Sequence, residues 1–95
     1  LVIGHGAEFQ DAAMRVAPEF PRTIYVSTGG NQVQGSAIGL EFAFEEGSYV
    51  AGVIAASVSR SNVIGCIAGT ELVPVRRSFA AFAAGARSVK PDIEI

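Results

Sequence analysis

Residues 1–17, LVIGHGAEFQDAAMRVA, decide the fold. Residues 1–3 form a short apolar run that fits a buried strand, and Gly4, His5 and Gly6 interrupt the run as a turn. The apolar residues that follow recur at the spacing of one helical face, and they are Phe9, Ala12, Ala13, Val16 and Ala17. Pro18 then ends the pattern. The stretch therefore predicts a strand, a glycine turn and a helix with one apolar side.

The same alternation continues through the rest of the chain. The remaining segments are predicted as strand 22–26, strand 37–44, helix 47–58, strand 62–67, a helix from about Pro74 to Pro91, and strand 92–95. Strands that alternate with one-faced helices favour an α/β fold with a mostly parallel sheet. Right-handed crossovers place the helices against the faces of such a sheet, so we expect three layers.

Length and composition limit what the chain can be. Its 95 residues allow one small domain at most, 49% of them are apolar and only 17% are charged. We therefore expect residues 1–95 to be a single partial domain whose surface packs against further protein. A net charge of -2 gives no electrostatic footprint for nucleic acid or an anionic membrane. No apolar run approaches the ~20 residues that span a bilayer.

Candidate ligand contacts follow the ends of predicted strands. In open parallel sheets, ligands bind beyond the carboxyl ends of the strands. This rule nominates residues 4–6, 27–29 and 69–71, and the candidate contacts among them are Gly4, His5, Ser27, Thr28, Gly69, Thr70 and Glu71. His5 fits a ligand contact or a half-exposed loop residue, and Phe9 fits core packing or stacking on a base.

Neither catalysis nor a cofactor is expected. His5 has no identifiable nucleophile or orienting partner, and the chain has no G-x-S-x-G nucleophile elbow. The single histidine and the single cysteine, Cys66, lie on separate predicted strands, so no metal site is expected. Phe9 stands where the third glycine of a G-x-G-x-x-G dinucleotide motif would be.

Three stretches together resemble the basic membrane protein family of ABC transporter substrate-binding lipoproteins, which includes purine nucleoside receptors. Residues 1–17 are similar to that family's strand, glycine turn and F-x-D-A-x-x-x-V-A helix. Residues 45–52, EEGSYVAG, are similar to its E-E-G-S-Y-L-A-G segment. Residues 64–69, IGCIAG, are similar to its G-F-V-G-G strand, and the helix that leads to KPDI at 90–93 completes the match.

The resemblance implies part of the amino-terminal lobe of a type I periplasmic-binding-protein (flavodoxin-like) fold. It implies a receptor that is not an enzyme and that closes two lobes on a small ligand such as a purine nucleoside or nucleobase. An ABC transporter permease would be its partner, and a lipid anchor outside this chain would hold it in the periplasm or at the cell surface. Ser27 stands where the family strand ends in an aspartate that contacts the ligand's sugar.

Two other interpretations remain open at this point. A flavodoxin-like α/β enzyme fragment would use His5 at a strand end, and the effector-sensing domain of a transcription regulator would share the two-lobed fold. The sequence before Leu1 distinguishes a receptor from a regulator, because a lipoprotein signal or a helix-turn-helix would stand there.

Overall fold

The structure, a computed structural model, describes all residues from Leu1 to Ile95. The chain divides into two compact units, residues 1–42 and residues 43–95. The first unit holds a sheet and a helix, and the second holds a pair of helices. The predicted α/β class with a mostly parallel sheet is confirmed.

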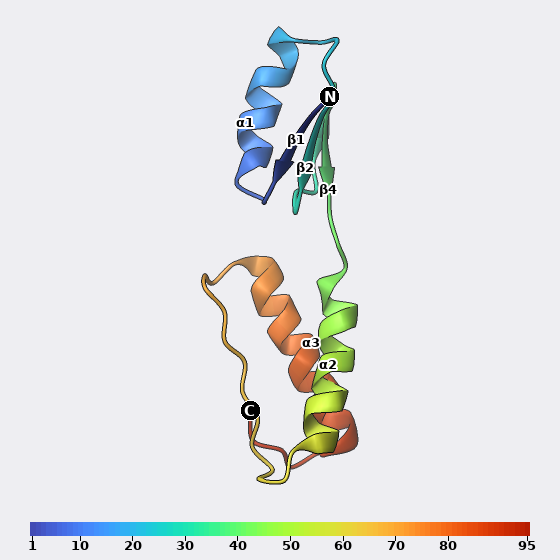
Figure 1. Cartoon of the computed structure of the whole chain (residues 1–95), viewed down its shortest axis with the longest axis vertical. Coiled ribbons are helices and arrows are strands. Elements are labelled where there is room, and N and C mark those ends of the chain that lie inside the picture. The colour runs from blue at the N-terminus through green and yellow to red at the C-terminus, as the bar shows by residue number, and fades with distance from the viewer. The chain divides into compact units, whose positions relative to one another are not determined.

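A four-stranded sheet forms the first unit, in the order β1-β2-β4-β3. Its elements are β1 (Val2–His5), α1 (Phe9–Val16), the 3-10 turn η1 (Ala17–Glu19), β2 (Tyr25–Thr28), β3 (Val33–Gln34) and β4 (Ala37–Leu40). β1, β2 and β4 are parallel, as their arrows show in Figure 1, whereas β3 runs antiparallel to β4. The register places Gly4 opposite Ser27, and Ser27 opposite Gly39.

Helix α1 packs against one face of this sheet through a few apolar side chains. Met14 and Ala17 are buried against Ala37 of β4, and Ala13 and Tyr25 pack around them. Pro18 occupies the first turn of η1, where a missing backbone N–H costs nothing, and so α1 gives way to a tighter turn. The helix predicted around residues 9–17 is therefore confirmed, although Phe9 and Val16 on its predicted apolar face remain 48% and 38% exposed.

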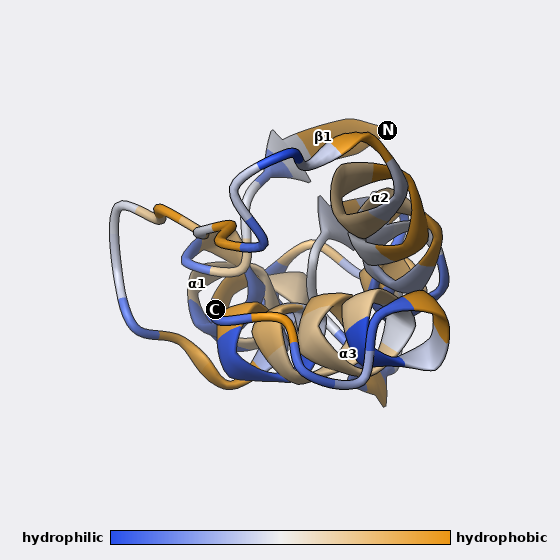
Figure 2. Ribbon diagram, turned by 90° about the horizontal axis from the view of Figure 1, so that it is seen from below, coloured by the Kyte–Doolittle hydropathy of each residue, from blue (hydrophilic) through white to orange (hydrophobic).

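The second unit is a helical hairpin made of α2 (Phe44–Val58) and α3 (Val73–Val89). Gly52 and Gly85 are buried at the crossing, and a Cβ on either would strike the backbone of the other helix. Ala56 and Ala86 form a small core with Ile93, and Ile64 packs against it. Figure 2 shows that α3 carries both hydrophilic and hydrophobic stretches. Neither helix is long and apolar enough to cross a membrane.

The prediction of strands at 62–67 and 92–95 is wrong. The two segments meet only at one parallel bridge between Val63 and Glu94. Ile64 N–H donates to Glu94 O and Glu94 N–H donates to Asn62 O, each at 3.0 Å. No further strand of this unit continues the ladder, and Ile67 is 99% exposed. The predicted strand at 37–44 is also shorter than expected, because it ends at Leu40 and α2 already begins at Phe44.

Candidate functional site

The carboxyl ends of β1 and β2 bring His5 and Thr28 side by side. The two residues are partners in the parallel register, and His5 Nδ1 lies 2.7 Å from Thr28 Oγ1. The N–H of Gly6 donates both to Thr28 Oγ1 at 3.3 Å and to Thr28 O at 3.1 Å. Gly6 has φ of +125°, a conformation that a side chain disfavours, so glycine is required to turn from β1 into α1. The predicted grouping of strand-end residues is thus present for this pair.

The loop after β2 is held in place by Gln10 from the first turn of α1. Gln10 Oε1 accepts hydrogen bonds from the N–H groups of Asn31 at 2.7 Å and Gln32 at 2.9 Å. The N–H of Gly29 donates to Leu40 O at 2.7 Å, which ties the start of the same loop to β4. Sequence reasoning missed Gln10, because a polar residue off the apolar face of a helix looks like any solvated residue. Its partners became evident only when the fold was known.

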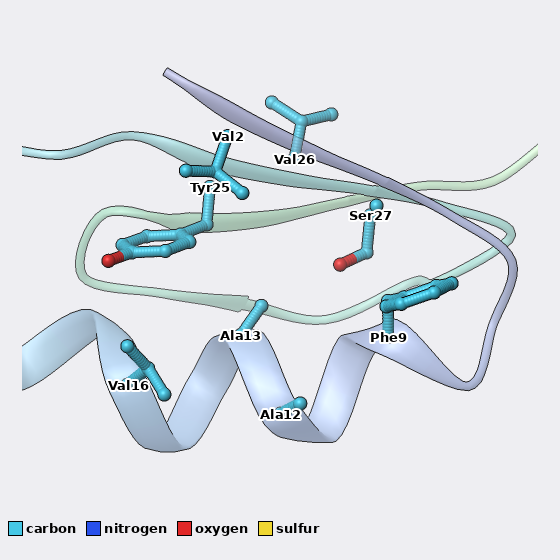
Figure 3. A pocket seen from close by; sticks show the side chains of 9 residues that line it. Val2, Phe9, Ala12, Ala13, Val16, Tyr25, Val26 and Ser27 are labelled. Carbon is cyan, nitrogen blue, oxygen red and sulfur yellow. The ribbon is translucent and has the colours of Figure 1, made fainter.

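A cavity of about 200 Å³ lies between α1 and the sheet. Gly4, Phe9 and Ser27 are among the residues that line it, and the rest of the lining is apolar apart from Tyr25. Figure 3 shows the hydroxyl of Ser27 pointing from β2 toward α1, while Val26 points away from the helix. Ser27 is only 2% exposed. Its hydroxyl therefore faces the space under the sheet.

The five predicted contacts of the first unit consequently fall into two groups. His5 and Thr28 lie at the strand ends, whereas Gly4, Phe9 and Ser27 line the cavity. Gly4 and Phe9 are close packed, because a Cβ on Gly4 would lie 2.7 Å from the Cβ of Phe9. The phenylalanine ring can lie over this position only if residue 4 has no side chain.

Gly69, Thr70 and Glu71 belong to the second unit, in the exposed segment before α3. They border a hollow of about 260 Å³ together with residues of the first turns of α3. Arg76 Nη1 lies 3.6 Å from Glu71 Oε1, but both side chains are mostly exposed, so the ion pair contributes little to stability. This pairing offsets some of the unfavourable interaction of Arg76 with the positive end of the helix dipole.

Metal chemistry has no constellation to support it. No group of three or more His, Cys, Asp or Glu side chains is arranged to hold a metal ion. Cys66 is a free thiol, and desolvation by burial raises its pKa. A thiol with a raised pKa is a poorer nucleophile at neutral pH, because less of it is present as thiolate.

Comparison with known proteins connects these features to one family. The family model for ABC transporter substrate-binding proteins of the PnrA-like (Bmp) type matches residues 1–95. The ABC transporter nucleoside-binding protein BmpA of Lactococcus lactis is 34% identical over 100% of this chain and 27% of its own length. A purine-binding protein of Brucella abortus is 31% identical over 92% of the chain and 25% of its own length.

Basic membrane protein A1 of Borrelia garinii is 30% identical over 95% of the chain and 28% of its own length. The chain thus spans about a quarter of the length of these curated relatives. The family resemblance that the motifs indicated is confirmed, and the match extends over every residue of the chain. This chain belongs to the Bmp family of PnrA-like ABC transporter substrate-binding proteins.

Proposed function

We propose that the protein containing this chain is the extracytoplasmic solute-binding component of an ABC transporter, and that its ligand is a purine nucleoside or nucleobase. Membership of the substrate-binding family supports the first part. The names of two relatives, a nucleoside-binding and a purine-binding protein, support the second. The structural observation that carries the proposal is the polar His5–Thr28 pair at the carboxyl ends of adjacent parallel strands, where ligands of open α/β sheets bind.

The first unit offers the groups that recognition of a nucleobase needs. His5 is exposed and Thr28 is partly exposed, so a ligand can reach both side chains. Phe9 follows them at the start of α1 with 48% of its surface exposed, and an aromatic face of this kind stacks on a base. Gly4 packs closely against Phe9, and Ser27 lines the same cavity. Gly69, Thr70 and Glu71, in the exposed segment before α3, are proposed as further ligand contacts.

Binding in this proposal involves no chemical step. The ligand is enclosed when two lobes close on it, and the transporter permease then receives it unchanged. A lipid anchor outside this chain holds the protein in the periplasm or at the cell surface. Ser27 is buried with its hydroxyl toward the cavity, so it does not offer a ribose diol the two acceptor oxygens of an exposed carboxylate. The free nucleobase is therefore included beside the nucleoside.

A thermal-shift screen of the full-length protein tests the proposal. Nucleosides, nucleobases, sugars and amino acids are compared at the same concentration, because a ligand at 100 times its dissociation constant stabilises by about 2.7 kcal/mol. We expect purine compounds alone to raise the melting temperature. His5→Ala should reduce the shift, and Glu19→Gln, an exposed substitution in η1, should not. A shift with a sugar or amino acid and none with purines would retain the receptor and refute its ligand.

A further inference from the structure

The hydroxyl of Thr28 stands between a backbone N–H and the imidazole of His5. Gly6 N–H donates to Thr28 Oγ1 at 3.3 Å, and Oγ1 lies 2.7 Å from His5 Nδ1. The three groups come from the end of β1 and the end of β2, which the parallel register holds next to each other. The distance between Oγ1 and Nδ1 is within the range of a direct hydrogen bond, and either atom can carry the shared proton.

Pairing each donor with an acceptor favours one direction. A threonine hydroxyl has one proton to donate, and the Gly6 N–H can only donate. If His5 carried its proton on Nδ1, both neighbours would donate to Oγ1, and the hydroxyl proton would have no acceptor among the bonds that Thr28 makes. If Nδ1 is unprotonated, the Gly6 N–H donates to Oγ1 and the Thr28 hydroxyl donates to Nδ1, so the two hydrogen bonds run in one direction. Every donor is then used, and bonds in such a chain strengthen one another.

We infer that Thr28 is a positioning residue that holds the His5 imidazole in the tautomer protonated on Nε2 and orients this N–H as a donor for the ligand. This inference rests on the proposed function, since it assigns a role to His5 within the same site. Because Nδ1 and Nε2 lie on opposite sides of the imidazole ring, the nitrogen that Thr28 does not occupy is the one available to a ligand. His5 is exposed at the strand end, so that nitrogen is accessible.

An Nε2–H donor on His5 limits which ligand group can bind there. That group must accept a hydrogen bond, as a carbonyl oxygen or an unprotonated ring nitrogen does. A 6-oxopurine presents two acceptors, N7 and O6, on one edge, whereas a 6-aminopurine presents N7 beside an amino donor. A 6-oxopurine can therefore meet the Nε2–H with either of two adjacent acceptors and a 6-aminopurine with N7 alone on that edge, so the 6-oxopurine nucleoside inosine is the appropriate probe.

Nitrogen NMR of the histidine-labelled full-length protein tests the positioning role without any ligand. Spectra are recorded at mildly alkaline pH, where imidazoles are neutral, and His5→Gln identifies the signals of His5. We expect an unprotonated Nδ1 whose resonance is displaced by an accepted hydrogen bond. Thr28→Val, which removes the hydroxyl at similar volume, should shift this resonance to the position of a free ring nitrogen, and Thr28→Ser should restore it. A protonated Nδ1, or no change in Thr28→Val, overturns the inference.

Titration with inosine tests the consequence for the ligand. Thr28→Val should weaken inosine binding about two- to tenfold, the range that one hydrogen bond of ordinary net strength represents. Thr28→Ser should recover most of the lost affinity. Thr23→Val, the same substitution before β2, serves as the matched control. Unchanged affinity in Thr28→Val refutes the positioning role, whereas a wild-type protein that binds no purine refutes the proposed function.

Discussion

Replacing Gly52 by alanine should destabilise the helical hairpin, although alanine is the better helix former. A Cβ at position 52 would lie 2.8 Å from the carbonyl carbon of Phe82 and 3.0 Å from the backbone nitrogen of Ala86, and it would be closer still to the Phe82 oxygen. All three atoms belong to the backbone of α3, so no side chain can rotate away to make room. The reciprocal contact at Gly85 meets the backbone of Tyr49 in the same way.

The magnitude follows from two opposing effects. Overpacking of a well-packed position costs about 1–3 kcal/mol, and rigid backbone neighbours place Gly52→Ala at the upper end of that range. Exchange of glycine for alanine inside a helix returns up to about 1 kcal/mol. The net loss of unfolding free energy should therefore be about 2 kcal/mol.

Urea unfolding, followed by helical circular dichroism, measures this loss. Gly47→Ala is the matched control, because Gly47 is exposed in the same helix and a Cβ there meets nothing within 4 Å. It should stabilise by about 0.5–1 kcal/mol through helix propensity alone. Equal stability of Gly52→Ala and wild type would refute the close approach of the two backbones. A destabilised Gly47→Ala would refute the helical assignment at the start of α2.

Three further predictions concern single groups. Gln10→Leu removes the acceptor that binds the N–H groups of Asn31 and Gln32, so hydrogen exchange at those two amides should accelerate about tenfold. Gln10→Glu keeps an acceptor oxygen and should change the exchange rate less. Lys90→Met removes the bond from Nζ to Ser59 O at 2.7 Å and should lower the unfolding free energy by about 1 kcal/mol, whereas unchanged urea unfolding would show that the bond contributes nothing. Because burial raises the pKa of the Cys66 thiol, alkylation by iodoacetamide at mildly alkaline pH should be slower in the folded than in the urea-unfolded protein, and equal rates would contradict the raised pKa.

The first unit could largely be predicted from sequence periodicity. The apolar run at β1, the turn at Gly6 and the one-faced α1 are local signals, and parallel pairing of β1 with β2 follows from the helix between them. The strand predictions at 62–67 and 92–95 failed because strand formation depends on tertiary pairing and not on local sequence alone. Their composition suits strands, but a strand exists only if a neighbour extends the ladder, and here a single bridge forms.

Some residues of the candidate site could be predicted from local sequence, and others could be identified only from tertiary contacts. The strand-end rule selected His5 and Thr28, and the structure joins them by a short contact. The direction of Ser27 could not be predicted, because alternation along β2 sends Tyr25 and Ser27 to one face and Val26 to the other, and a two-sided strand does not indicate which face the helix covers. Gln10 became identifiable only from its contacts with the loop after β2.

Equilibrium dialysis of the full-length protein against labelled inosine tests whether the protein is a purine nucleoside receptor. We expect saturable binding of one nucleoside per protein and recovery of the label as intact inosine, because a solute-binding protein releases its ligand unchanged. Recovery of free hypoxanthine, or the absence of any retained label at high protein concentration, would contradict it.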